Sequence, residues 1–218
     1  MGNIYFDKMT TDCGAAPCVD KGKLSLAICK PSIRKKAKEA DIVFGFGCQA
    51  LGEKLIYVAR IAKVIEDGRY YDGGSPYAGR IDCIYRWQDG ELVFRRGAKV
   101  HGPEDRDHDV GPAAKHTRNA NVLVADKFVY FGKAGTDEYK KTCPHLKRSI
   151  ERLTQGHRIN HRPELARELS ALYRDCIAKH GAHKILGRPH HPLKNRPPCH
   201  ESEGEAVCIR GTHSRSPA

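Results

Sequence analysis

The sequence predicts an α+β protein in which a compact, strongly bent mixed β-sheet, or a small PUA-like barrel, is flanked by helices. In the first part of the chain the apolar segments are short and rich in β-branched and aromatic residues, as in residues 42–44 and 55–64. The linker that contains Gly52 and Glu53 permits a hairpin between these two segments. Toward the C-terminus the apolar residues instead follow helical spacing, most clearly in residues 163–180. Strands and helices therefore occupy different parts of the chain, which is typical of the α+β class.

Residues 24–64 contain the densest structural pattern, and the rest of the predicted fold is arranged around them. Residues 24–29 suit a buried strand that ends at Lys30 and Pro31, because proline has no backbone donor and disfavours helical geometry in the residue before it. A short helix is expected over residues 32–40. It is expected to expose four basic side chains, Arg34, Lys35, Lys36 and Lys38. The centre is thus predicted to be a sheet with one basic helix against it.

The remaining elements follow from the same patterns. Further strands are predicted at residues 4–6, 81–87, 91–95, 121–124 and 127–131, and a further helix at residues 146–153. Two polar segments rich in turn-forming residues, 10–22 and 97–121, are expected to be loops. We expect one globular domain over residues 1–186, followed by a disordered basic tail rich in proline and histidine over residues 187–218.

The composition indicates a basic protein that does not enter a membrane. The 218 residues carry a formal net charge of +12, and the pI is near 9.3. This charge favours phosphate-bearing partners, although a generally basic, solvated surface has the same composition. No apolar run approaches the roughly 20 residues that span a bilayer, and no secretory pattern is seen, so a cytoplasmic location is expected. The nine cysteines are then expected to be reduced thiols rather than disulfides.

No metal and no cofactor are expected from the motifs. The chain has no Cys-x-x-Cys pair, and the spacings of Cys143 with His145 and of His157 with His161 do not match a standard zinc site. A phosphate-binding loop, a dinucleotide fingerprint and a serine nucleophile elbow are also absent from the sequence.

Four residues are candidates for catalysis, although the sequence shows no complete catalytic set. Cys29 precedes Lys30, whose ammonium group would lower the pKa of the thiol; a buried, inert cysteine at the end of a strand is the alternative. Asp12 and Asp126 are candidate bases, although an aspartate such as Asp126 between two strands is also a common turn residue.

A second set of residues has the properties needed to bind a nucleotide. Tyr70, Tyr71 and Tyr77 lie close in sequence to Arg69 and Arg80, which combines aromatic faces for stacking with guanidinium groups for phosphate. Tyrosines in such a position also commonly cover a sheet edge. The full set of candidate nucleotide-binding residues is Thr11, Asp12, Arg34, Lys35, Lys36, Lys38, Tyr70, Tyr71 and Tyr130.

Three segments of the chain resemble a known family. They are residues 8–47, which begin KMTTDCGAAPC, residues 55–61, LIYVARI, and residues 121–132, NVLVADKFVYFG. Together they closely resemble the second type of nucleotide-modification-associated domain, found in bacteria and their phages, over about residues 4–180. The resemblance implies a role connected with modified nucleotides, with nucleic acid or nucleotides, above all modified DNA, as partner. It also implies a cytoplasmic location in a bacterium or in the host of a phage.

The order of segments is also similar to that of PUA-like barrels, which include EVE and YTH domains. In those domains a basic segment, here residues 33–38, precedes an apolar strand, here residues 41–44. A second strand, here residues 57–64, then leads to a tyrosine-rich loop, here residues 70–72. Such domains hold a modified base in a pocket of aromatic and polar side chains. The cage residues have no clear counterparts in this sequence, and a shared fold does not determine function.

Three function hypotheses remain open at this point. The preferred one is recognition of a modified nucleobase in nucleic acid, in a DNA-modification or phage-defence context, with the basic residues at the phosphates and the tyrosines at the base. The second is an enzyme that makes, removes or processes a modified nucleotide, in which Cys29 or Lys30 is the nucleophile and Asp12 or Asp126 the base. The third is a non-catalytic protein-interaction module with a basic surface.

Overall fold

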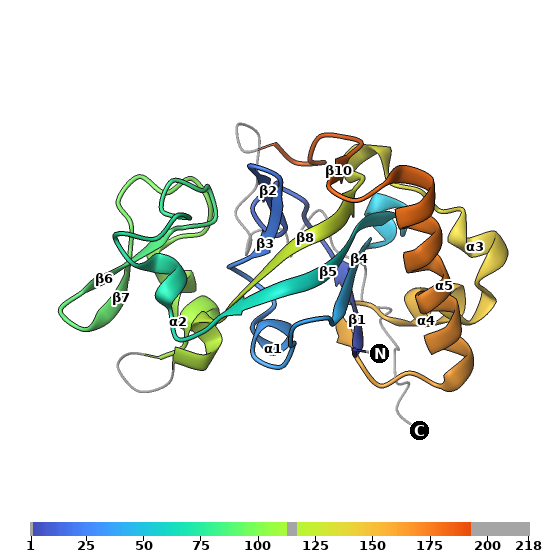
Figure 1. Cartoon of the computed structure of the whole chain (residues 1–218), viewed down its shortest axis with the longest axis horizontal. Helices are drawn as coiled ribbons and strands as arrows, with labels where there is room; N and C mark the ends of the chain where they lie inside the picture. Colours follow the sequence, from blue (N-terminus) through green and yellow to red (C-terminus); the bar gives the residue numbers. More distant parts are fainter. Residues whose placement is uncertain (1, 113–116, 193–218) are drawn as a thin grey trace, which may run out of the picture.

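A large mixed β-sheet forms the centre of the computed structural model, which describes residues 2–112 and 117–192 (Figure 1). The strand order is β2-β3-β8-β5-β4-β1-β9, and β10 also pairs with β8. The β1–β4 and β10–β8 pairs are parallel, and the other pairs are antiparallel. The strands are β1 (Ile4–Met9), β2 (Cys18–Asp20), β3 (Lys23–Leu26), β4 (Ile42–Gly47), β5 (Leu55–Ile65), β8 (Val122–Tyr130), β9 (Gly156–Arg158) and β10 (Lys184–Ile185).

One face of the sheet is covered by C-terminal helices. Phe6, Phe44 and Val58 on this face form a buried cluster with Leu146 of α4 (Pro144–Arg152) and Leu169 of α5 (Pro163–His180). Figure 1 shows α5 and α4 together with α3 (Tyr139–Thr142) on the right of the sheet. The apolar stripe read from the sequence of α5 is what docks this helix, because burying that stripe removes it from water.

The opposite face packs against the segment that connects β3 to β4. Val43 and Phe128 lie in this cluster with Ile33 of α1 (Pro31–Arg34) and with Ala37 beyond it. Several polar side chains of the strands also point to this face, and they contribute to the site described below.

A smaller lobe extends from one end of the sheet, on the left of Figure 1. Its buried core contains Tyr70, Tyr71, Tyr85 and Val110, and Val122 of β8 joins this core to the sheet. The lobe is built from η2 (Arg69–Tyr71), β6 (Tyr85–Gln88), β7 (Glu91–Phe94), η3 (Pro103–Asp105), α2 (Arg106–Val110) and η4 (Thr117–Ala120). Two further short turns, η1 (Gln49–Leu51) and η5 (Gly132–Ala134), lie beside the sheet.

The predicted α+β class is confirmed, and the sheet is open rather than closed into a barrel. The two strands predicted at residues 121–124 and 127–131 are one strand, β8, because pairing continues through Ala125 with both Leu24 and Ile61. The helix predicted over residues 32–40 keeps regular helical structure only over Pro31–Arg34. None of the described helices is long and apolar enough to cross a membrane.

Part of the expected tail is in contact with the domain. The backbone N–H of Lys133 donates to the carbonyl of Arg188 at 2.8 Å, and the N–H of His191 donates to the carbonyl of Asp12 at 2.8 Å. Residues 193–218, the rest of the predicted tail, lie outside the described residues.

Gly45 in β4 lets neighbouring side chains lie directly over the backbone, on the face of the sheet that carries the polar side chains. It pairs with Asp7 of β1 on one side and with Tyr57 of β5 on the other. A methyl group at Gly45 would lie 2.0 Å from Cε1 of Tyr57 and 2.8 Å from Sδ of Met9. The Tyr57 ring therefore lies directly over the glycine, and only a residue without a side chain leaves room for it.

We predict that Gly45→Ala lowers the free energy of unfolding by roughly 1–3 kcal/mol, because the Tyr57 ring must shift within a packed core. Chemical denaturation measures the change. Gly73→Ala is the control, since a Cβ there meets nothing within 4 Å. Equal stability of the two variants would contradict the packing described for Tyr57.

Candidate functional site

The turn between β3 and α1 holds its backbone in an unusual conformation. Cys29 and Lys30 both have positive φ angles, 55° and 47°. For residues with a side chain this left-handed conformation costs roughly 1–2 kcal/mol each, so surrounding contacts must maintain it. Two contacts involve Cys29 directly: its N–H donates to Oδ1 of Asp109 at 2.7 Å, and its carbonyl accepts from Nε of Arg34 at 2.6 Å. The turn presents the partly exposed Cys29 thiol toward the lobe.

A histidine and an aspartate from the lobe line up behind this thiol. Nε2 of His101 lies 3.2 Å from Sγ of Cys29, and Nδ1 of the same ring lies 2.5 Å from Oδ2 of Asp109. The side chains of His101 and Asp109 are 3% and 0% exposed. A thiol, an imidazole and a carboxylate in this order form the arrangement that activates a cysteine nucleophile and orients its base.

The carboxylate is held in its charged form. Burial alone would raise the pKa of Asp109, but the hydrogen bond and charge of His101, with the charge of Arg34 and the Cys29 N–H, bring it below its ordinary value. Because the folded-state pKa is depressed, this group stabilises the fold fully above about pH 4. The contribution is lost as the pH falls through the lower folded-state pKa. At neutral pH the carboxylate is therefore available to stabilise an imidazolium.

Arg34 connects the elements that carry the three residues. Its guanidinium group donates to the carbonyls of Cys29 and of Asp109, the latter at 2.5 Å. It also donates to the carbonyls of Asn119 and, at 2.9 Å, of Asn121. The expected exposure of Arg34 is thus wrong, because the residue is 0% exposed and its donors are directed at backbone carbonyls.

The tyrosines predicted to stack on a base are placed inside the lobe. Tyr70 donates to Oδ1 of Asp82 and Tyr71 to the carbonyl of Ala27, both at 2.7 Å, and both tyrosines are fully buried. Tyr85, which was not singled out from the sequence, donates to Oδ2 of Asp109 at 2.8 Å. These rings pack in the core of the lobe, and Tyr85 orients the Asp109 carboxylate. A role for Tyr70 and Tyr71 in nucleotide binding stays a prediction.

The other candidate residues fall into two places. Asp12 is buried and accepts hydrogen bonds from the hydroxyl of Tyr130, at 2.8 and 2.9 Å, and from the N–H of His190 at 3.2 Å. Thr11 is partly exposed beside it. Asp126 lies on the side of the sheet covered by α5, where its charge acts on Tyr173. Of the four residues predicted for catalysis, Cys29 is the one whose side chain contacts His101 among the described residues.

Lys30 forms a second polar contact next to the thiol. Its ammonium nitrogen lies 2.9 Å from Oδ2 of Asp7, and the two side chains are only 11% and 9% exposed. Burial alone would lower the pKa of Lys30, but the charges of Asp7, Tyr57 and Cys29 raise it above its usual value. Lys30 is therefore charged, and it is better described as an ammonium partner of the thiol than as an amine nucleophile.

Cys29, His101 and Asp109 also meet a distance criterion for a metal site, since one donor atom from each lies within 4.8 Å of the others. The imidazole, however, points one nitrogen at the sulfur and the other at the carboxylate. One ion cannot bind both nitrogens of the same ring, so this arrangement suits proton transfer better than chelation.

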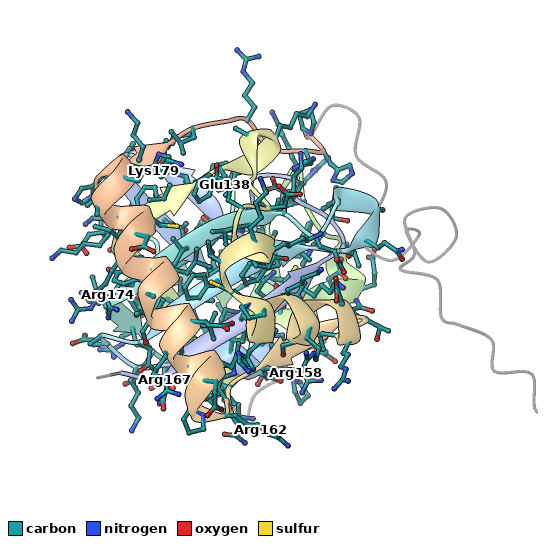
Figure 2. All side chains as sticks on the ribbon, turned by 90° about the vertical axis from the view of Figure 1, so that its right-hand side faces the viewer. Glu138, Arg158, Arg162, Arg167, Arg174 and Lys179 are labelled. Carbon is teal, nitrogen blue, oxygen red and sulfur yellow. The ribbon has the colours of Figure 1, made fainter. Side chains whose placement is uncertain are left out.

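Exposed basic residues lie both near and far from the thiol. Lys35, Lys36 and Lys38 follow α1 directly and are exposed, as predicted for the basic helix. Another set lies on and near α5, where Figure 2 labels Arg158, Arg162, Arg167 and Arg174. In Figure 1 this helix is at the opposite end of the molecule from α2. The net charge therefore does not by itself locate a binding site.

The sequence did not identify His101 and Asp109 as functional. Both lie in residues 97–121, which were expected to be an irregular loop, although the structure contains α2 there. The available signal was the segment VHGPEDRDHDVG, in which histidines and aspartates are interspersed with glycines. Nothing in that segment indicates which histidine faces Cys29, because the pairing spans 72 residues.

The fold and this arrangement define an α+β protein with an open mixed sheet and a Cys–His–Asp group where the sheet meets the lobe. The family model described as nucleotide modification associated domain 2 matches residues 1–194, so the chain belongs to this family, as the sequence resemblance indicated. The family description connects the protein with nucleotide modification. No curated protein and no solved structure matches the chain.

We predict that Arg34→Met lowers the free energy of unfolding by roughly 3 kcal/mol or more, because it leaves buried carbonyls without donors. Thermal and denaturant unfolding measure the change. Lys35→Met is the matched control: the neighbouring lysine is exposed, and its replacement is expected to change stability by less than about 0.5 kcal/mol. Similar losses in both variants would contradict the connecting role of Arg34.

Proposed function

We propose that the protein is a thiol-dependent acyl-transfer enzyme that acts on a modified nucleotide, with Cys29 as nucleophile. The observation that carries the proposal is the contact series from the Cys29 sulfur through both nitrogens of His101 to Asp109. A sulfur nucleophile with a proton-accepting histidine suits attack on a carbonyl carbon that bears a nitrogen or oxygen leaving group. The family's connection with nucleotide modification directs this chemistry to an amide or ester carried by a nucleotide.

Each residue has one role in this reaction. Nε2 of His101 removes the proton of the thiol, and the thiolate attacks the carbonyl carbon of the acyl group. The same proton passes to the departing amine or alcohol as its bond to the carbonyl breaks, which leaves a thioester on Cys29. Water then attacks the thioester carbonyl: its hydroxyl group leaves with the acyl group as the carboxylic acid, and its proton passes through His101 to the departing sulfur, which restores the thiol. Asp109 keeps the ring oriented through Nδ1 and stabilises the positive charge that forms on it.

The geometry favours this reaction over recognition alone, which was the preferred hypothesis from the sequence. Recognition by stacking needs an aromatic face that the base can reach, whereas Tyr70, Tyr71 and Tyr130 are buried and hydrogen-bonded within the protein. Cys29 is partly exposed, its backbone has the left-handed conformation, and a buried histidine and carboxylate lie behind its thiol. This arrangement has a direct use in catalysis. Base recognition remains part of the proposal as the means of selecting the substrate.

The test uses oligonucleotides with one 5-(acetylaminomethyl)pyrimidine, which present a nucleobase-linked amide. We expect release of acetate and the free amine, and an acetyl group on the Cys29 peptide after acid quench and mass spectrometry. Cys29→Ala abolishes both signals. His101→Asn lowers the rate by about 10²–10⁴-fold, the usual contribution of a general base.

Cys176→Ala is the control for cysteine replacement. Burial raises the pKa of the Cys176 thiol to about 12, so this cysteine is unreactive and its loss leaves the rate unchanged. Acetylation of another cysteine, or unchanged turnover in Cys29→Ala, would refute the proposal. Activity that a chelator removes and zinc restores would instead support a metal ion held by the same three residues.

The basic residues after α1 are proposed to hold the phosphates of the substrate. Lys35 and Lys36 are exposed and lie five to seven residues after the thiol-bearing turn. The double variant Lys35→Ala/Lys36→Ala is expected to flatten the dependence of log affinity on log salt by about one unit for each phosphate group that the protein no longer neutralises. Oligonucleotide binding at several salt concentrations measures the slope. Arg167→Ala/Arg174→Ala on α5 is the charge-matched control, and an equal effect of that pair would place the nucleic acid elsewhere.

A further inference from the structure

A row of polar side chains crosses the sheet next to the Cys29 turn. Asp7 of β1 pairs with Gly45 of β4, Gly45 with Tyr57 of β5, and Tyr57 with Tyr130 of β8. Residues in register on adjacent strands point to the same face, so Asp7, Tyr57 and Tyr130 lie side by side on one face of the sheet. Gly45 provides the space over which the Tyr57 ring extends.

Two atoms of this row have no hydrogen-bond partner among the described residues. The hydroxyl of Tyr57 is one, on a side chain with no exposure, and Oδ2 of Asp7 is the other. Oδ2 is nevertheless ion-paired with the Lys30 ammonium at 2.9 Å, so the Tyr57 hydroxyl is the atom of this row that calls for a missing partner. Buried polar atoms are nearly always paired, and those that are not call for a missing partner such as a ligand or a water.

The protonation of the row determines what it can bind. Burial raises the pKa of Tyr57 well above its ordinary value, although the charge of Lys30 opposes this, so the hydroxyl keeps its proton. Lys30 is charged and directs its ammonium group toward Asp7. The row and the neighbouring Lys30 therefore provide donors at Lys30 and Tyr57 and an acceptor at Asp7.

We propose that Asp7, Lys30 and Tyr57 bind the hydrogen-bonding edge of a uracil- or thymine-type base, which presents an N–H between two carbonyl oxygens. Asp7 accepts the N–H, and Lys30 and Tyr57 donate to the two oxygens. This inference rests on the proposed function and names its substrate class. The charge of Cys29 acts on Lys30, so under the proposal the acyl substituent of a base bound here lies on the side of Cys29.

Lys30 and Asp7 are the members of this group that lie nearest the surface. Lys30 and Asp7 retain 11% and 9% exposure, and Cys29 is partly exposed beside them, whereas Tyr57 lies beneath. Under the proposal, the long side chain of Lys30 must therefore move aside when a ring enters.

The chemistry also excludes close analogues. Cytosine has an unprotonated ring nitrogen and an amino group where uracil has an N–H and an oxygen. It would place a lone pair against the Asp7 carboxylate and an amino group against the Lys30 ammonium. Because the Tyr57 hydroxyl both donates and accepts, discrimination against cytosine rests on Asp7 and Lys30.

Two oligonucleotides that differ only in the base test the inference. One carries 5-(acetylaminomethyl)uracil and the other 5-(acetylaminomethyl)cytosine, so the amide that is cleaved is the same. We expect acetylation of Cys29 to be at least about tenfold faster with the uracil substrate, the effect of about one good hydrogen bond. Acetylation of Cys29 at equal rates refutes the base assignment and leaves the acyl-transfer proposal standing.

A second arm needs no turnover, and it distinguishes a free nucleotide from a base in a polymer. Alkylation of Cys29 by iodoacetamide is followed on its peptide with UMP, CMP, GMP or unmodified oligonucleotides of T or C present. Slower alkylation with UMP, with the T oligonucleotide or with both supports the subsite and shows which form it takes. Equal protection by CMP or GMP, or no protection at all, overturns it even if no substrate is acetylated.

Tyr57→Phe separates ligand binding from a structural role, because the hydroxyl has no partner to lose within the described protein. We expect an unchanged or higher melting temperature, unchanged alkylation without nucleotide, and a loss of about tenfold in protection by the uracil-type ligand. Tyr139→Phe is the control. The hydroxyl of Tyr139 donates to the Glu53 carbonyl at 2.7 Å, so this variant lowers the melting temperature and leaves protection unchanged. If Tyr57→Phe raises the melting temperature without affecting protection, the row holds an internal water only and the inference fails.

Discussion

The buried guanidinium group of Arg34 is the interaction on which the site depends. It joins the carbonyl of Cys29 to those of Asp109, Asn119 and Asn121, so it connects the turn before α1 to α2, to η4 and to the residue that precedes β8. A planar group with five fixed donors suits this task, because backbone carbonyls in loops otherwise lack partners once they are removed from water. The left-handed conformation of Cys29 and Lys30 costs free energy, and these hydrogen bonds, with the Asp109 contact to the Cys29 N–H, offset it.

The three parts of the proposed site come from different layers of the fold. The lobe supplies the histidine and the carboxylate, the sheet supplies the polar row at Asp7 and Tyr57, and the turn between β3 and α1 places the thiol and Lys30 between them. In this turn Cys29 and Lys30 both have positive φ angles, and their side chains reach different parts of the fold. Cys29 contacts His101 of the lobe, and Lys30 contacts Asp7 of the sheet. A shift of the lobe relative to the sheet would separate the thiol from its base, which explains why so many buried hydrogen bonds cross this junction.

The aromatic and basic residues show how little composition says about a surface. Tyr70, Tyr71 and Tyr85 have the chemistry of base-stacking residues, yet their rings fill the lobe core and their hydroxyl groups satisfy Asp82, Ala27 and Asp109. Arg34 is likewise internal. On α5, Arg167 lies 3.6 Å from Glu164 and Lys179 lies 3.1 Å from Glu138, so part of the basic charge forms exposed ion pairs of small energetic value.

The sequence by itself determined the α+β class, the family, the paired strands around residues 42–64, the docking helix α5 and the candidacy of Cys29 and Lys30. These depend on the local period of apolar residues, on turn-forming residues and on near neighbours in the chain, all of which the sequence displays directly. Only the tertiary structure decided that Cys29 faces His101 and Asp109, that Arg34 is buried, and that Asp7 and Tyr57 lie in one row. Those relations join residues far apart in the chain through strand register and loop packing, and no periodic pattern in one sequence records which distant residues meet.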